Sequence, residues 1–362
     1  MDTSAGAVLE VDLGAIADNW RMIGRLHPSG PVAAVLKADA YGLGAPAVAN
    51  RLFAAGCRHV FVAHLDEARV LRPLLPGAML AVLNGLWPGD APAYSDAGIA
   101  PVLGSLSEVG EWTAHARTRG RALPALLHVD TGMNRLGLSP EEVDVLAAEP
   151  ARLDGIRLLF VVTHLVSAEW PDDPVNALQR GRFAQACARL PAAPHSIANS
   201  SGCFLGGDFG SDLARPGAAL YGVNPTPGRP NPMRAAVRLR ARILQTRDVP
   251  PGARVGYNGA WTAQRPSRIA TVSVGYADGY PRTLTNHAAA CFDGQAVPLV
   301  GRVSMDLSTF DITDAPGAGP GTWLDLIGPG MPVDEVASRA GTNGYEILTQ
   351  LGARYRRVYL DA

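Results

Sequence analysis

The sequence predicts an eight-stranded α/β barrel followed by a mostly β second domain. Short apolar runs rich in β-branched residues recur about every 20 to 35 residues in the first part of the chain, separated by stretches of helical character. Such alternation is typical of parallel strands covered by helices. A proline-rich stretch at residues 225–232 is suited to an interdomain passage, and beyond it the runs alternate apolar and polar residues. We therefore divide the chain into a barrel at 1–230 and a mostly β domain at 231–362.

The predicted elements follow in order along the chain. Residues 8–13 alternate and predict a strand, and apolar residues at helical spacing from Ile16 to Leu26 predict a helix. The last two of the eight barrel strands are weakly marked, so a doubly wound parallel sheet remains an alternative. The barrel strands are expected at 31–36, 59–63, 79–83, 99–103, 126–129, 158–162, 196–198 and around 213–214, and the second domain should hold strands at 237–244, 269–274 and 296–300 and helices near 333–340 and 346–351.

Size and composition predict a compact cytoplasmic protein. The 362 residues are enough for two domains with cores of their own, and 47% are hydrophobic against 18% charged. A net charge of -1 gives no electrostatic reason to expect nucleic acid or a membrane as partner. The four cysteines lack metal-binding spacing, which predicts buried thiols and no metal. The N-terminus lacks a signal-peptide pattern, and no apolar run approaches the ~20 residues of a membrane span.

Lys37 stands out because it is the only lysine among 32 lysine and arginine residues. It follows directly on the apolar run of residues 31–36, where a solvated surface residue is not expected. Arginine stays protonated and is a poor nucleophile, whereas a partly desolvated lysine amine can lose its proton and condense with a carbonyl. We therefore interpret Lys37 as a residue that forms a Schiff base, rather than as a remaining surface lysine.

Polar side chains follow the ends of several predicted strands, where barrel active sites are built. Ser200 and the glycine-rich turns at Gly202 and Gly217 follow the last two strands. Glycine lets backbone amides approach an anion closely, and barrels often bind phosphate in these loops. A phosphate site together with a Schiff-base lysine predicts pyridoxal 5′-phosphate as the cofactor. The residues at or just beyond predicted strand ends are Lys37, His64, Asp130, His164, Ser200 and Arg215.

Several motifs are spread over both predicted domains: AVLKADAYG, HVDTGMNRLG, THL, ANSSG, RPGAALYG, VGYNGAW, SVGYADGYPR, GRVSMD and YEILTQL. In this order, and over about residues 8 to 359, the chain resembles the alanine racemase family of fold-type III pyridoxal phosphate enzymes. The resemblance implies an eight-stranded α/β barrel followed by a β domain. It also implies a homodimer whose active sites are shared between the subunits and which acts on an amino-acid substrate.

By this resemblance, Lys37 would bind the cofactor as a Schiff base and act as one of two bases. Tyr257, in VGYNG, would be the second base and would face the first from the partner subunit. Two bases are needed because inverting a stereocentre requires removing a proton on one face and returning one on the other. A tyrosine is a poor base at its usual pKa of ~10. The resemblance implies that His164 and Arg215 support Tyr257 by hydrogen bonds; a core role is the alternative for His164.

The resemblance also places Arg215 against the pyridine nitrogen of the cofactor. An arginine donates a hydrogen bond there but supplies no proton, so the ring is a weaker electron sink, which suits racemisation. An ion pair with Asp212 is the alternative role of Arg215. By the same resemblance, the phosphate would be bound by Tyr41, Ser200, Gly217, Ala218 and Tyr345. The substrate carboxylate would be bound by Arg135 and the Met305 amide. The entrance would be narrowed by Tyr276 and Tyr345, with Glu169, Arg282 and Arg302 further out.

Two positions depart from the pattern of the family. Many members carry a lysine modified by carbon dioxide at the position of His128, and its negative charge holds the arginine at position 135. His128 supplies no anion, so we hypothesise that a chloride or another carboxylate takes that place. Asn258 follows Tyr257 where a glycine is common, which leaves the loop geometry and the substrate range open.

Together these patterns predict an enzyme that interconverts L- and D-alanine and supplies D-alanine for peptidoglycan. Serine or a broader substrate range is the alternative within the family. A non-catalytic pyridoxal phosphate-binding protein is a more distant alternative, because such proteins resemble the barrel alone and lack the domain that bears Tyr257 and Met305. A decarboxylase of the same fold type is disfavoured by Arg215.

Overall fold

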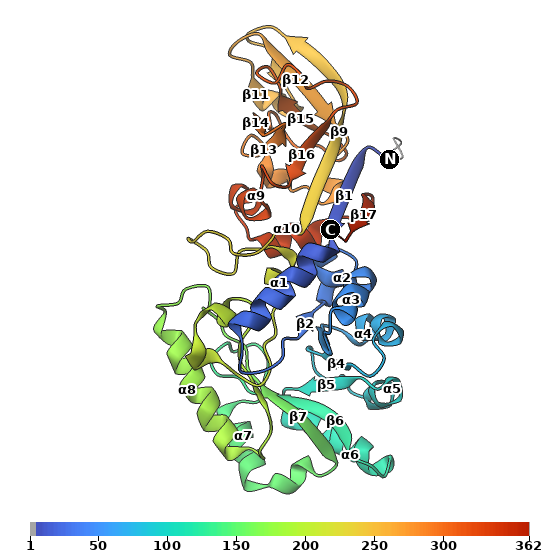
Figure 1. The fold of residues 1–362 in the computed structure, drawn as a ribbon, viewed down its shortest axis with the longest axis vertical. Coiled ribbons are helices and arrows are strands. Elements are labelled where there is room, and N and C mark those ends of the chain that lie inside the picture. The colour runs from blue at the N-terminus through green and yellow to red at the C-terminus, as the bar shows by residue number, and fades with distance from the viewer. Residues whose placement is uncertain (1–4, 362) are drawn as a thin grey trace.

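The computed structural model describes residues 5–361, which form two domains stacked along the long axis of the molecule (Figure 1). The barrel domain takes up one end, and a β-rich domain takes up the other. The chain ends near the junction between them (Figure 1). No helix in the described part of the chain has both the length and the apolar character needed to cross a membrane.

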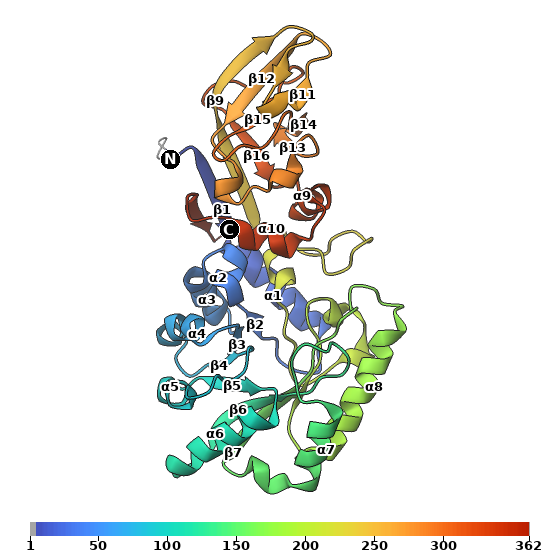
Figure 2. The same ribbon diagram turned by 180° about the vertical axis from the view of Figure 1, so that it is seen from behind.

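Seven short parallel strands form most of the barrel wall, each bonded to the next in sequence order, as expected of repeated β–α units. Seen from behind, α7 and α8 cover the opposite side of the barrel from α3, α4 and α5 (Figure 2). The strands are β2 (Ala34–Val35), β3 (His59–Val62), β4 (Met79–Val82), β5 (Ala100–Leu103), β6 (Leu123–His128), β7 (Ile156–Val162) and β8 (His195–Ser196), and the helices are α1 (Leu13–Leu26), α2 (Lys37–Gly42), α3 (Ala45–Ala54), α4 (Leu65–Leu71), α5 (Ala91–Ala97), α6 (Leu106–Thr118), α7 (Pro140–Ala148) and α8 (Pro174–Arg189).

The barrel closes through the segment at residues 213–216. The amide of Ala33 donates to the carbonyl of Ala214 (2.8 Å), and the amide of Arg215 donates to the carbonyl of Ala198 (2.8 Å). This segment lies between the strands at either end of the sheet, so it takes the place of the eighth strand. The predicted barrel is therefore confirmed over the doubly wound sheet. Pro216 has no amide hydrogen to donate in this ladder, but its carbonyl still accepts the amide of Val35 (3.0 Å).

The second domain is built on a mixed sheet around β9 (Val237–Val249), a strand of 13 residues. The strand order is β14-β13-β16-β9-β1-β17, and β12 and β15 extend from β9. The helices predicted near residues 333–340 and 346–351 are α9 (Val333–Ala340) and α10 (Gly344–Gln350). The remaining strands are β10 (Arg254–Val255), β11 (Trp261–Thr262), β12 (Ser267–Val272), β13 (Ala289–Phe292), β14 (Gln295–Pro298), β15 (Ser308–Asp311), β16 (Trp323–Ile327) and β17 (Arg356–Leu360).

The first strand of the chain belongs to this second sheet and not to the barrel. β1 (Ala7–Asp12) pairs antiparallel with β9 and parallel with β17. Both partners come from the C-terminal part of the chain, and the local pattern of a strand does not reveal such distant partners. The structure therefore differs here from the predicted division, which assigned all residues before 231 to the barrel domain.

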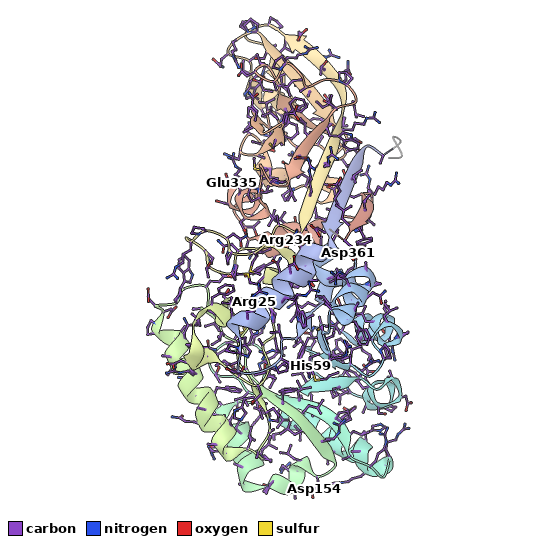
Figure 3. The ribbon with its side chains drawn as sticks, in the orientation of Figure 1. Arg25, His59, Asp154, Arg234, Glu335 and Asp361 are labelled. Carbon is purple, nitrogen blue, oxygen red and sulfur yellow. The ribbon has the colours of Figure 1, made fainter. Side chains whose placement is uncertain are left out.

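Charged side chains link the parts of the chain that meet at the junction of the two domains. Arg234 pairs with Asp18 of α1, and Arg51 of α3 pairs with Asp361 at 2.5 Å. Arg234 and Asp361 both lie at this junction in Figure 3. Partly exposed pairs of this kind contribute only ~0–1 kcal/mol each. Apolar packing therefore contributes most of the stability of the junction.

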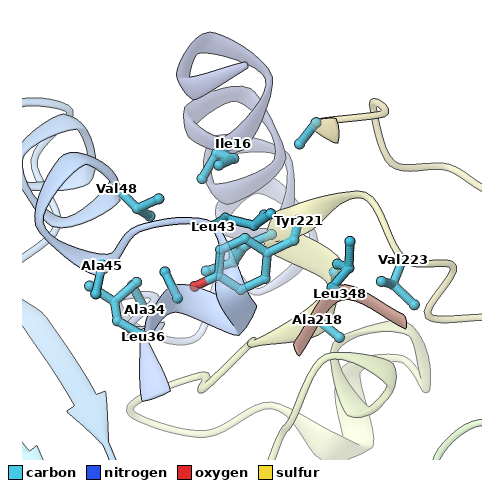
Figure 4. Close-up of a cluster of buried hydrophobic side chains, with 14 of the residues drawn as sticks. Ile16, Ala34, Leu36, Leu43, Ala45, Val48, Ala218, Tyr221, Val223 and Leu348 are labelled. Atoms are coloured by element: carbon cyan, nitrogen blue, oxygen red, sulfur yellow. The ribbon is translucent and has the colours of Figure 1, made fainter. Parts of the chain in front are cut away.

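That packing centres on Tyr221, which is fully buried beside the first barrel strand. Leu36, Ala218 and Leu348 are among the side chains around it (Figure 4). Because Leu348 belongs to α10, a helix of the second domain packs against the barrel. The hydroxyl of Tyr221 donates to the carbonyl of Val35 (2.9 Å), so its polar end is satisfied. This contact fixes the strand end from which Lys37 emerges.

Candidate active site

Lys37 begins a turn of left-handed helix at the end of β2. Residues 38–41 all have φ between 53° and 56°. For residues other than glycine this conformation costs ~1–2 kcal/mol per residue. Four such residues in a row persist only where the surroundings hold them, and strain of this kind concentrates at functional sites.

Side-chain carboxylates and a glycine hold the turn in place. The Glu67 carboxylate accepts the amide of Ala38 at 2.6 Å, next to Lys37. The Asp39 carboxylate accepts the amide of Ala45 at 2.7 Å and so caps α3. Gly42 ends the turn with a φ of 82°, and a Cβ at this position would overlap a backbone carbonyl of α10. The turn is therefore fixed at its start, in its middle and at its end.

The side chain of Lys37 is half-buried at the mouth of the barrel. Burial lowers the pKa of its amine, the charge of Arg135 lowers the pKa further, and the charge of Glu67 raises it in part. A lowered pKa increases the neutral fraction of the amine, which is the form that acts as nucleophile or base. The environment of Lys37 therefore suits the chemical role predicted for it.

Arg215 is buried at the end of the closing segment. Its guanidinium donates to the hydroxyl of Ser196 and to the carbonyl of Thr163. Burial lowers its pKa to about 10, so it remains a cation at neutral pH. The carboxylate of Asp212 instead accepts the amide of His195 (2.7 Å), so the alternative ion pair with Asp212 is not formed. The charge of Arg215 is therefore available to a ligand.

Two histidines near Arg215 are neutral at neutral pH. Burial, and then the charge of Arg215, lower the pKa of His164 to about 3 and that of His128 to about 4. A neutral imidazole offers one donor and one acceptor. His128 therefore adds no second positive charge beside Arg135. The carbonyl of His164 accepts from the buried side chain of Gln179 (2.9 Å), which fixes the loop after β7.

Ser200 and Gly217 lie in a cluster of backbone amides. The Ser200 hydroxyl accepts the amides of Gly217 (3.0 Å) and Ala219 (3.3 Å) at the start of η5 (Ala218–Tyr221). A Cβ at position 217 would overlap the hydroxyl of Tyr41, so glycine lets Tyr41 approach this backbone. Burial raises the pKa of Tyr41 to about 12, so its hydroxyl stays protonated. Amides and hydroxyl groups that converge in this way are suited to a phosphate.

Tyr345 brings the second domain of the same chain to the barrel mouth. It lies on α10, which packs against α2. Its hydroxyl donates to the Glu169 carboxylate at 2.5 Å, and burial and then this carboxylate raise the pKa of Tyr345. Tyr345 was predicted to bind the phosphate and to narrow the entrance, and Glu169 was predicted further out along the entrance. In the structure these two side chains are hydrogen-bonded to each other.

The loop after β6 presents Arg135 to solvent. The Asp130 carboxylate accepts the three amides of residues 132–134 at 2.8 to 2.9 Å, so it is used within its own loop. Within residues 5–361, no hydrogen bond or ion pair engages the guanidinium of Arg135, although its charge acts on Lys37 and His164. Asp130 is thus not the carboxylate that replaces the modified lysine, and Arg135 is available to a substrate carboxylate.

Tyr257 and Met305 lie apart from Lys37 within one chain. Tyr257 begins η6 (Tyr257–Gly259), the turn between β10 and β11, and β11 lies in the second domain, away from the barrel (Figure 1). Its side chain is 69% exposed, and that of Met305 is 54% exposed. The structure thus brings the barrel residues of the predicted site together, but one chain does not bring the second base to them.

The predicted entrance residues of the second domain are also exposed or half-buried. The amide of Ala277 donates to the carbonyl of Met305 (2.9 Å), so the loops of Tyr276 and Met305 lie side by side. An open hollow in the same domain is lined in part by Arg282 and Arg302. Two arginines without an acidic side chain in the lining give the hollow a positive potential, which attracts carboxylates.

Two residues that contact the loops of the site, Glu67 and Gln179, were not predicted from the sequence. Glu67 occupies the third position of α4, where a glutamate is a common capping residue, so the capping pattern would have identified it. Its contact with Ala38, however, depends on the neighbouring strands and has no local signal. Gln179 is fully buried on α8, and its helical position alone gives no reason to expect a contact with the His164 loop.

The residues present fit pyridoxal phosphate. Lys37 supplies an amine for an aldehyde, and the amides near Ser200 and Gly217 suit a phosphate. Arg215 is a buried donor that can satisfy a ring nitrogen, because no carboxylate among residues 5–361 pairs with its charge. This donor set matches the three polar parts of that cofactor.

Two sequence families match the two domains of the chain. The family described as "Alanine racemase, N-terminal domain" matches residues 11–225, and "Alanine racemase, C-terminal domain" matches residues 236–359. The gap between the two matches contains most of the proline-rich passage.

Similar proteins cover almost the whole chain. The alanine racemase of Acidiphilium cryptum is 56% identical over 350 residues, which cover 97% of this chain and 98% of that protein. A protein of Agrobacterium fabrum named "Alanine racemase, catabolic" is 48% identical and covers 99% of this chain and 93% of its own length. The crystal structure of alanine racemase from Bartonella henselae with covalently bound pyridoxal phosphate has a TM-score of 0.95 and 40% identity over 98% of this chain and all of that one. This chain therefore belongs to the alanine racemase family.

Proposed function

We propose that this protein is an alanine racemase, which interconverts L- and D-alanine with pyridoxal 5′-phosphate as cofactor. The observation that carries the proposal is the position of Lys37. The only lysine of the chain stands half-buried at the barrel mouth, with a lowered pKa. Full-length similarity to alanine racemases supports this assignment.

The cofactor is assigned to the barrel half of the site. When bound, pyridoxal phosphate supplies an aldehyde that takes up the substrate amine and a ring that withdraws electrons from the substrate Cα. Arg215 donates to the ring nitrogen without protonating it, because its pKa of about 10 keeps it charged. The residues proposed to hold the cofactor are Lys37, Tyr41, His164, Ser200, Arg215, Gly217, Ala218 and Tyr345.

Proton transfer at the substrate Cα is assigned to Lys37 and Tyr257. The lowered pKa of Lys37 favours the neutral amine, which accepts a proton on one face of the substrate. The Tyr257 oxygen acts on the other face, with the neutral ring of His164 as a hydrogen-bond partner. Arg135 and the amide of Met305 bind the substrate carboxylate, and the arginine has no ion pair to break within the described part of the chain.

A homodimer with shared sites follows from this assignment. One chain does not bring Tyr257 to its own Lys37, so the second base must come from the partner subunit. The exposure of Tyr257 and Met305 supports this arrangement, because a contact with a second subunit would bury both side chains. The entrance residues Tyr276, Arg282 and Arg302 would line the path between the subunits.

Hybrid dimers test the shared site directly. Lys37→Ala and Tyr257→Phe are each expected to be inactive as homodimers. In a hybrid, one of the two sites combines the intact Lys37 of one chain with the intact Tyr257 of the other. Co-refolding equal amounts should therefore restore about a quarter of wild-type activity, since half of the dimers are hybrids with one good site. No recovery, in a mixture that size exclusion shows to be dimeric, would exclude sharing.

Chiral chromatography tests the substrate. Each L-amino acid is incubated with the holoenzyme, and the D-product is measured against time. Alanine is expected to react fastest, because Tyr345 and Tyr276 narrow the proposed entrance. A faster reaction with serine would replace alanine by serine as the substrate and would leave the cofactor and the bases unchanged.

The physiological role is proposed to be the supply of D-alanine for peptidoglycan in the cytoplasm. All four cysteines are free and buried, which agrees with a reducing compartment. A similar protein carries the name catabolic, so the role requires a test of its own. Deleting the gene should make growth depend on added D-alanine. Normal growth without it, in a strain with no other alanine racemase activity, would contradict the cell-wall role.

A further inference from the structure

Three glutamates occupy the same position on three helices of the barrel. Glu67, Glu108 and Glu142 are the third residues of α4, α6 and α7. Each carboxylate accepts backbone amides at the start of its own helix and also reaches the loop that follows a neighbouring strand. These residues therefore cross-link the loops at the mouth of the barrel, beyond the capping of single helices.

Glu67 differs from Glu108 and Glu142 in the loops that its carboxylate contacts. One oxygen of its carboxylate accepts the amide of Ala38 at 2.6 Å. The other accepts the amides of Ala63 (2.7 Å) and His64 (3.1 Å) at the end of β3. Ala38 is the first residue of the left-handed turn and follows Lys37 directly. Glu67 thus ties the strained turn that carries the lysine to the rigid end of the next strand.

We propose that Glu67 is a positioning residue for Lys37, holding the left-handed turn so that the amine points into the barrel mouth. This inference rests on the proposed function, because it assigns Glu67 to the same site. The charged and titratable groups that act on the amine are Arg135 from the loop after β6, His164 from the loop after β7, and Glu67 from α4. Glu67 is the only anion among these three.

The chemistry of the contact explains why a carboxylate is needed. Amide hydrogens approach both oxygens, so both ends of the side chain must be acceptors. A glutamine has one oxygen and one NH₂ group, and the NH₂ group would meet an amide donor on one side. An aspartate keeps the charge, but it is one methylene shorter and cannot span both loops.

The test compares Glu67→Gln with Glu142→Gln in the full-length protein. Glu142 is the matched control, because it also bridges two loops, from Ser139 (3.0 Å) to Leu106 (3.0 Å), but it does not contact the lysine turn. Glu67→Gln should lower kcat for alanine about 10- to 100-fold, the effect of losing a charged hydrogen bond, with little change in KM. Glu142→Gln should leave kcat within about twofold of wild type, because its half-buried cross-link ends at Leu106 and Ser139, neither of which belongs to the proposed site.

A second readout does not depend on activity. Because Lys37 is the only lysine, feeding lysine labelled with ¹⁵N at the ε position gives one side-chain signal, which can be titrated in the cofactor-free chain. In Glu67→Gln the midpoint should move to lower pH, because a neighbouring anion is lost. In Glu142→Gln it should stay at the wild-type value.

Equal kcat and equal ¹⁵N midpoints in the two variants would overturn the proposal. If Glu67→Gln does not fold, Glu67→Asp is measured in its place. It should lower kcat while the midpoint stays near wild type, and an unchanged kcat would likewise overturn the proposal. If the wild-type protein itself does not racemise alanine, the proposed function fails, whereas the ¹⁵N titration still decides whether Glu67 acts on Lys37.

Discussion

The two halves of the proposed site differ in how complete they are within one chain. In the barrel half, Arg215 is buried, Lys37 is half-buried, and the turn after Lys37 is fixed by contacts at each end. In the second-domain half, Tyr257 and Met305 are largely exposed, and their chain does not bring them to the barrel mouth. One chain is thus able to build a cofactor site but not the opposed pair of bases.

The two halves also differ in the free-energy cost of their geometry. The barrel half carries a left-handed turn and a buried arginine, both costly, and it holds them with hydrogen bonds from within the chain. The loop of Tyr257 is held by a hydrogen bond from the Arg254 guanidinium to the carbonyl of Asn258 (2.8 Å), but the Tyr257 side chain itself is 69% exposed. In the proposed dimer, the partner subunit would set the position of this side chain, so we expect changes in the two halves to produce different kinds of defect.

The largest effect is expected from Lys37→Ala. The barrel half would lose its only amine, so the cofactor should no longer be bound covalently, and racemisation should fall by about 10⁴-fold or more. Absorbance of the bound cofactor and chiral chromatography measure the two losses. Borohydride treatment of the wild-type protein should place the reduced cofactor on Lys37. Reduced cofactor attached to any other residue would contradict the assignment of Lys37 as the residue that binds it.

Tyr257→Phe should remove proton transfer by the second-domain half and leave cofactor binding by the barrel half unchanged. The variant keeps the barrel half intact, so covalent cofactor should remain at the wild-type level, whereas racemisation should fall by about 10²–10⁴-fold through loss of one proton-transfer group. Exchange of the alanine Cα hydrogen with deuterium from solvent should continue on the face served by Lys37. Full activity in both directions would rule out the two-base mechanism.

The same division explains how much the sequence could predict. Lys37, Ser200 and Arg215 each follow an apolar run, so the order of strands placed them at one barrel mouth. The bridging role of Glu67 and the pairing of β1 depend on neighbours brought together by folding, and no local pattern records such neighbours. The position of Tyr257 followed only from the family resemblance, because an exposed tyrosine in a β domain has no chemical signature of its own.

Gly217→Ala is expected to weaken the barrel half without removing a reactive group. The added methyl would overlap the Tyr41 hydroxyl, so Tyr41 or the amides near Ser200 must move. Such overpacking costs ~1–3 kcal/mol, which corresponds to about 5- to 150-fold weaker retention of the cofactor. Equilibrium dialysis of the cofactor measures this loss.

Gly110→Ala provides the control for this substitution. Gly110 lies inside α6, and a Cβ there meets no atom within 4 Å. The change should leave cofactor retention unchanged and stabilise the fold by ~0.5–1 kcal/mol, because alanine favours helix. Equal cofactor retention in the two variants would show that Gly217 is not required for a close approach of Tyr41.

The last prediction concerns the pH dependence of stability, and it belongs to the barrel half alone. Burial, and then the charge of Arg215, lower the pKa of His128 from 6.5 to about 4 in the folded protein. Between these values the unfolded chain holds a proton that the folded chain does not, so the free energy of unfolding should rise with pH by up to ~1.4 kcal/mol per pH unit. This contribution is fully present above pH 6.5 and is lost as the pH falls towards 4. His128→Gln removes one group that takes up a proton on unfolding, so the slope should fall by the contribution of that proton. The lowered pKa of His164 should keep part of the slope in the variant. Urea denaturation at several pH values measures both slopes, and identical slopes would mean that His128 is as easily protonated in the folded chain as in the unfolded one.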